Sequence, residues 1–137
     1  MRTILIILAA GLAAPALAAP TTMTTMMTGA AEVPGPGAPN GQGKAVITIE
    51  PAKKQLCFDL TASGTDTPTM AHVHQGAVGV AGPVVVALDP PANGMAKGCK
   101  PVSEDVAKAI IATPADYYVN VHTATYPKGA MRGQLGK

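Results

Sequence analysis

The strongest constraint on the fold is a period-two alternation of apolar and polar residues within short segments. Two segments, residues 44–50 (KAVITIE) and 55–62 (QLCFDLTA), have this pattern. Their alternate apolar residues are Ala45, Ile47 and Ile49 in the first segment and Leu56, Phe58 and Leu60 in the second. Such alternation indicates β-strands with one face against a core and the other toward solvent.

Further short segments have strand-like composition, and Gly- and Pro-rich stretches separate them. The chain contains 15 glycines and 13 prolines, which favour turns over long helices. The additional strands are expected at residues 21–29, 70–74, 83–89, 116–123 and 130–135. About seven short strands in one small domain are typical of an all-β, antiparallel Greek-key sandwich or barrel.

One short helix is expected over residues 103–114. Ser103 is a suitable N-cap, the acidic residues after it suit the positive end of the helix dipole, and Pro114 ends the segment. The spacing predicts that Val106, Ala109 and Ile110 face the core.

The first residues have the composition of a signal peptide, assigned here to residues 1–18. Arg2 precedes an apolar stretch, and Ala16-Leu17-Ala18 is a small-x-small cleavage site. The apolar stretch is shorter than the roughly 20 residues that a membrane-spanning helix needs, although an uncleaved anchor is the alternative. We expect cleavage after Ala18, no permanent membrane span after it, and a single exported domain over residues 19–137.

Charge and aromatic content argue against binding nucleic acid. The formal net charge is +2 at pH 7, and there is no basic run along the chain. With one Phe, three Tyr and no Trp, the chain also lacks a platform on which bases could stack.

The two cysteines, Cys57 and Cys99, are expected to form a disulfide in an exported protein. Closing the loop between Cys57 and Cys99 would stabilise a small domain by about 4 kcal/mol in the chain-entropy model. Free thiols or soft metal ligands are the alternatives.

Three histidines fall in two strand-like segments. Residues two apart on a strand share a face, so His72 and His74 point to the same side. His122 lies in a later strand and shares a face with Asn120. If these strands are neighbours, one polar surface gathers His72, His74, Asn120, His122, Arg132 and Gln134.

Two interpretations of this polar surface are open. Three neutral imidazoles can hold a zinc or copper ion and leave a fourth position for another ligand. Asn120 and Gln134 would then orient the imidazoles, and Arg132 would bind an anion or pair with Asp59. Alternatively the histidines are structural and hydrogen-bond to loop backbone, Asn120 and Thr123. Arg132 weighs against a metal, because a permanent cation repels a divalent ion.

The motifs AHVHQGAVGVAGPVVVAL and YYVNVHTATYPKGAMRGQL resemble the CHRD domain, a module of the extracellular protein chordin and of small exported bacterial proteins. The early stretch GAAEVPGPG is also similar to the family's pattern, and the likeness spans nearly the whole mature chain. The family usually has glycine at Gln75, isoleucine at Met131 and often an acidic residue at Ala130. The resemblance implies an immunoglobulin-like β-fold and little about activity.

These observations indicate a role outside the cytoplasm but do not point to a particular enzyme class. Several functions are therefore compared. We expect a periplasmic or secreted, non-catalytic binding module, with a copper or zinc ion at His72, His74 and His122 as the sharpest hypothesis. The rivals are a copper-dependent redox enzyme similar to superoxide dismutase and a structural or adhesive module. An extracellular protein partner is compatible with either non-catalytic function.

Overall fold

The structure is a computed structural model that describes residues 18–136. These described residues form an all-β fold with one α-helix, as expected, and three short 3-10 turns. The strands are β1 (Thr21–Thr28), β2 (Gln42–Glu50), β3 (Gln55–Ser63), β4 (Pro68–Gln75), β5 (Val84–Leu88), β6 (Met95–Pro101), β7 (Tyr117–Thr123) and β8 (Met131–Gln134). The helix is α1 (Glu104–Ala112), and the 3-10 turns are η1 (Gly29–Ala31), η2 (Pro51–Lys53) and η3 (Pro114–Asp116).

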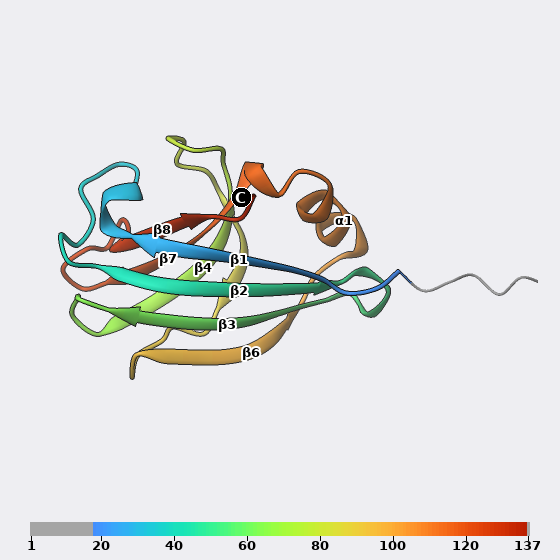
Figure 1. Cartoon of the computed structure of the whole chain (residues 1–137), viewed down its shortest axis with the longest axis horizontal. Helices are drawn as coiled ribbons and strands as arrows, with labels where there is room; N and C mark the ends of the chain where they lie inside the picture. The colour runs from blue at the N-terminus through green and yellow to red at the C-terminus, as the bar shows by residue number, and fades with distance from the viewer. Residues whose placement is uncertain (1–17, 137) are drawn as a thin grey trace, which may run out of the picture.

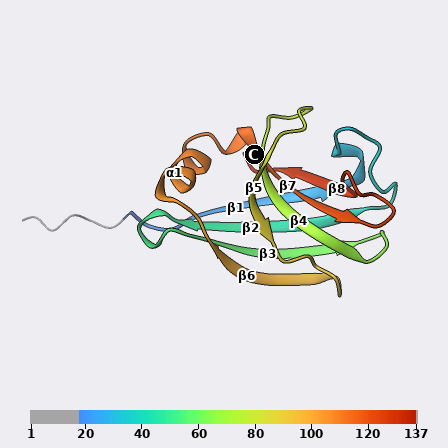
Figure 2. The same cartoon turned by 180° about the vertical axis from the view of Figure 1, so that it is seen from behind.

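All neighbouring strands are antiparallel, and their order across the sheet is β5-β4-β7-β8-β1-β2-β3-β6. Figures 1 and 2 show that the sheet folds over, so that β4 and β7 cross β1, β2 and β3 at an angle. The two end strands, β5 and β6, come into contact, which nearly closes the sheet into a barrel. The helix α1 lies at one end of the barrel and η1 at the other (Figures 1 and 2).

The apolar residues of the alternating segments form the core, as predicted. The core joins the strands to α1, and its most buried members are Met27, Ala45, Ile47, Ile49, Leu56, Leu60, Ala71, Val73, Ala107, Ile110, Val119, Val121 and Met131. Because successive side chains of a strand point to opposite faces, the polar residues between them lie on the outside of the barrel.

Seven strands were expected, and β6 is the additional strand that the sequence did not predict. Its residues alternate between exposed and half-exposed, and none is buried, so it lacks the apolar alternation of the other strands. It lies at an end of the sheet, where Cys99 faces Cys57 of β3 in register. The predicted disulfide between these two residues is confirmed. An ion pair of 2.8 Å between Lys97 Nζ and Asp59 Oδ2 also links the two strands.

The helix α1 is capped as predicted, because Ser103 Oγ accepts a hydrogen bond of 3.2 Å from the Val106 amide. Its buried face differs from the prediction. Ala107 and Ile110 are buried, whereas Ala109 is exposed. Val106 and Ile111 pack against the core beside these two, so the packed face is centred near Ala107 and Ile110. Ala109 lies about 160° round the helix from Ala107 and therefore faces away from the core.

The predicted signal peptide, residues 1–18, lies outside the described residues except for Ala18. Within residues 18–136, no helix is both long enough and apolar enough to cross a membrane.

Candidate metal centre

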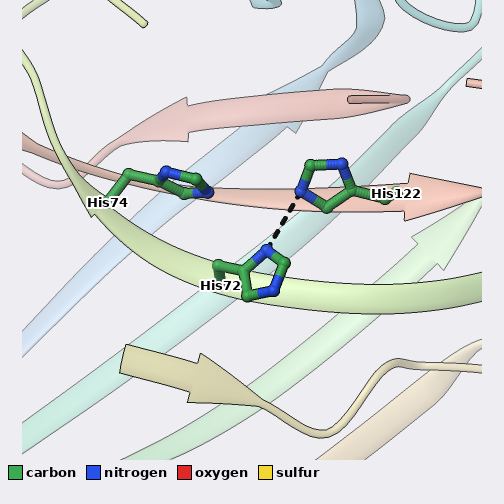
Figure 3. Close-up of side chains that lie close together, drawn as sticks. All are labelled: His72, His74 and His122. Carbon is green, nitrogen blue, oxygen red and sulfur yellow. Dashed lines mark hydrogen bonds between the residues drawn. The ribbon is translucent and has the colours of Figure 1, made fainter. Parts of the chain in front are cut away.

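Two adjacent strands bring the three histidines together. In the pairing of β4 with β7, His72 lies opposite Asn120 and His74 opposite Tyr118. Ala71 and Val73 of β4 point into the core, so His72 and His74 lie on the outer face, where His122 of β7 also points. Figure 3 shows the three rings turned toward one another, with His72 between and below the other two.

The ring nitrogens are close enough to share one ion. One nitrogen from each ring can be chosen so that all three lie within 4.8 Å of one another. His72 Nδ1 and His122 Nε2 are the closest pair, at 3.0 Å (Figure 3).

Two backbone carbonyls determine the tautomers of His74 and His122. His74 Nδ1 lies 2.9 Å from the Gly82 carbonyl oxygen, and His122 Nδ1 lies 3.1 Å from that of Pro127. A carbonyl oxygen only accepts, so each Nδ1 carries the proton and donates. In the neutral rings, each Nε2 therefore has a free lone pair. The Nε2 of His74 is buried and has no hydrogen-bond partner.

The environment favours the neutral imidazoles of His72 and His122. Burial, followed by the proximity of His122 and His74, lowers the pKa of His72 to about 4. Burial also lowers the pKa of His122, although its bond to Pro127 acts in the opposite direction. Neutral imidazole is the form that coordinates a metal ion.

Arg132 lies on the same face but is separated from the histidines. The Tyr118 ring stacks on His74, with 4.8 Å between ring centroids and 2° between planes. The Arg132 guanidinium lies 3.4 Å from the centroid of the same ring. Since β7 lies between β4 and β8, Tyr118 stands between His74 and the cation.

The partners of Arg132 differ from those expected. Its Nη1 donates to the Val80 carbonyl and its Nη2 to the Ala77 carbonyl, both at 2.8 Å, and Nη2 also donates to Gln134 Oε1 at 3.1 Å. It does not pair with Asp59, because Asp59 lies on β3 and pairs with Lys97. Arg132 therefore fastens the loop after β4 onto the outer face.

Gln134 and Thr123 lie on or beside this face without bonding a histidine ring. The Gln134 amide donates to the carbonyls of Gly76 and Ala115, each at 2.7 Å. Thr123 Oγ1 accepts from the Tyr126 amide at 3.1 Å and so stabilises the turn that contains Pro127. Asn120, unlike Gln134 and Thr123, contacts a histidine ring. Its Oδ1 lies 3.0 Å from His122 Nε2.

Sequence reasoning assigned no role to Glu32, which the structure buries beside this site. Glu32 follows η1 and is 5% exposed, with an Oε1 that has no hydrogen-bond partner. Burial raises its pKa to about 7, against smaller lowering effects of the Val33 backbone, the Arg132 charge and the Asn120 amide. Its carboxyl packs so closely on Gly129 that a side chain there would collide with it. The sequence signal for it was its place in GAAEVPGPG, the early stretch that is similar to the family's pattern.

A groove of about 710 Å³ runs beside the histidines and not over them. It lies along the outer side of β1, and among its lining residues are Thr24, Met26, Glu32, Val78 and Arg132, with none of the three histidines. The histidine cluster itself is compact, which suits a single ion better than an organic ligand.

Comparison with known proteins identifies the domain. The family model described as the CHRD domain matches residues 23–135. No curated protein and no solved structure matches the chain.

Proposed function

This chain belongs to the CHRD domain family, and we propose that it is a non-catalytic module that binds one zinc or copper ion through His72, His74 and His122. The observation that carries the proposal is the convergence of one nitrogen from each of the three rings within 4.8 Å. The Nε2 of His74 is in addition buried and has no hydrogen-bond partner. A buried polar atom without a partner costs about 1–3 kcal/mol, which a bound ion would relieve.

The surroundings of the rings support a metal rather than a purely structural role. The carbonyls of Gly82 and Pro127 hold the proton on Nδ1 of His74 and His122, so the Nε2 of each ring carries the lone pair. Partners of this kind orient the imidazole ligands of metal sites. Three imidazoles are a donor set that suits zinc and copper. Arg132 opposes a divalent ion less than its charge implies, because three oxygen acceptors and the Tyr118 ring surround it.

We also propose that the protein acts outside the cytoplasm, in the periplasm or as a secreted protein. The predicted signal peptide and the Cys57–Cys99 disulfide support this location, because disulfides persist in oxidising compartments.

The test is a metal titration of the full chain exported to a bacterial periplasm, so that the disulfide can form. After removal of metal with a chelator, Zn²⁺ and Cu²⁺ are titrated by calorimetry into the wild type, His74→Ala and Gln75→Ala. Gln75 is an exposed neighbour on the same strand and serves as the matched control. We expect one equivalent to bind to the wild type and Gln75→Ala, and binding at least tenfold weaker in His74→Ala.

Failure of the folded wild type to bind either ion at micromolar concentration would contradict the proposal. The histidines would then be a structural seam, and His74→Ala would lower thermal stability only. Turnover of superoxide by the copper-loaded wild type would instead favour a redox enzyme.

A further inference from the structure

We infer that the amide oxygen of Asn120 is the fourth ligand of this metal centre, which makes it a site of three nitrogens and one oxygen. The inference rests on the proposed function, because it concerns the same ion. It assigns Asn120 a direct contact with the metal, rather than the orientation of an imidazole.

The first observation is an apparent mismatch between Asn120 and His122. The Oδ1 of Asn120 lies 3.0 Å from His122 Nε2. His122 donates through Nδ1 to the Pro127 carbonyl, so in the neutral ring Nε2 has a lone pair and no proton. Two electron-pair donors therefore face each other at hydrogen-bond distance. A cation that both atoms coordinate removes this repulsion.

The second observation concerns the proton between His72 and His122. His72 Nδ1 lies 3.0 Å from the same His122 Nε2. If His72 donates there in the metal-free protein, it satisfies the lone pair of His122 but supplies nothing to Asn120 Oδ1. His122 Nε2 carries no proton to donate, so Asn120 Oδ1 receives no hydrogen bond from this ring. The buried His74 Nε2 also has no hydrogen-bond partner.

The third observation is the orientation of the Asn120 amide. The amide atom that lies against His122 Nε2 is the oxygen, Oδ1, which is the atom that can coordinate a cation.

The spacing agrees with shared coordination. Ligand atoms about 2.0–2.2 Å from a tetrahedral ion are roughly 3.4 Å apart. His122 Nε2 lies 3.0 Å from both Asn120 Oδ1 and His72 Nδ1, so movements of a few tenths of an ångström bring these atoms to that spacing. The histidine nitrogens lie within 4.8 Å of one another, so the set as a whole must close further around an ion. An oxygen donor beside three imidazoles favours Zn²⁺ or Cu²⁺ over the softer Cu⁺.

Met70 is the rival for the fourth position. It lies opposite His122 in the pairing of β4 with β7 and is 45% exposed. A thioether ligand there would favour Cu⁺ instead. Asn120 is preferred because its oxygen already lies within 3.0 Å of a ligand nitrogen.

The test compares Zn²⁺ affinity of the full chain in the wild type, Asn120→Leu and Met70→Leu, all with the disulfide formed. Leucine has nearly the shape of asparagine and no donor atom. We expect at least tenfold weaker binding in Asn120→Leu and wild-type binding in Met70→Leu. Equal binding by folded Asn120→Leu and wild type would overturn the inference and leave the proposed three-histidine site intact. Absence of binding by the wild type would instead reject the proposed function.

X-ray absorption of the zinc-loaded wild type provides a second measurement, which distinguishes an oxygen ligand from the sulfur of Met70 even if Asn120→Leu does not fold. We expect three imidazole ligands and one oxygen. Scattering from a sulfur ligand would assign the fourth position to Met70 and overturn the inference.

Discussion

β2 and β7 each lie between two hydrogen-bonded neighbours in the same sheet, yet only β7 is buried along its whole length. The outer side chains of β2 remain exposed or half-exposed, as in an ordinary barrel strand. Over β7 and β8, the loop after β4 is fastened by Arg132 and Gln134, and the segment after β1 bonds to Ala130 through the Ala38 amide.

The difference shows how one barrel maintains two kinds of outer surface. On the open half, formed by β1, β2, β3 and β6, outer side chains are solvated, and their loss costs little. On the covered half, formed by β4, β7 and β8, buried polar side chains lose their contact with water. They must form hydrogen bonds with one another or with loop carbonyls. The histidine cluster lies on the covered half. Its buried His74 Nε2 is an exception to this rule, because it has no hydrogen-bond partner.

The largest expected loss of stability comes from a change on the open half. Replacing both cysteines, Cys57→Ala/Cys99→Ala, frees β6, which buries no side chain of its own. The disulfide joins residues 42 apart in the sequence. We expect a loss of about 4 kcal/mol in the free energy of unfolding, measured by urea denaturation. A loss below about 1 kcal/mol would mean that the β3–β6 pairing is stable without the bond.

The next largest loss of stability is expected from a change on the covered half. Arg132→Met keeps much of the side-chain volume but leaves the Ala77 and Val80 carbonyls and Gln134 Oε1 without their donor. We expect a loss of about 3 kcal/mol in the free energy of unfolding, because Arg132 is 2% exposed and its bonds hold the loop over it. Faster hydrogen exchange in residues 76–82 should accompany it. Wild-type exchange in that loop would indicate that Arg132 does not hold it.

A change of pH separates the two titrating groups of the covered half in metal-free protein. The pKa of Glu32 rises from its ordinary 4.5 to about 7 on folding, so its contribution to stability is full below about pH 4.5 and lost as the pH rises through 7. The pKa of His72 falls from 6.5 to about 4, so its contribution is present above pH 6.5 and lost as the pH falls through 4. The two contributions oppose each other between these limits.

Glu32→Gln removes the first contribution and keeps the second. We expect the stability of this variant to rise with pH more steeply than that of the wild type, by about 2–3 kcal/mol between pH 4 and pH 8. Urea midpoints over this range, measured in the presence of a chelator, check the prediction. Parallel profiles of the two proteins would show that Glu32 does not titrate with a raised pKa.

The smallest effect provides the matched control for Arg132. Lys97→Met makes the same kind of change on the open half, where the Lys97 side chain is 69% exposed in its ion pair with Asp59. We expect a change of less than about 0.5 kcal/mol, because exposed ion pairs contribute little. A loss as large as that of Arg132→Met would remove the distinction between the two halves.

The strands and the core could be largely predicted from the sequence, because side-chain direction along an extended chain is a local property. The residues of β2 and β3 that face the core were assigned from alternation alone, and so was the common face of His72 and His74. β6 was missed because alternation between exposed and half-exposed residues leaves no apolar pattern.

The sequence by itself therefore determined the all-β class, the core faces, the disulfide and the set of polar residues that share one outer face. The tertiary structure decided which atoms they meet: the Gly82 and Pro127 carbonyls at the imidazoles, Tyr118 between His74 and Arg132, and Glu32 behind Asn120. These contacts depend on strand register and on loops that fold back across the sheet. Both bring together residues distant in sequence, so no local pattern contains them.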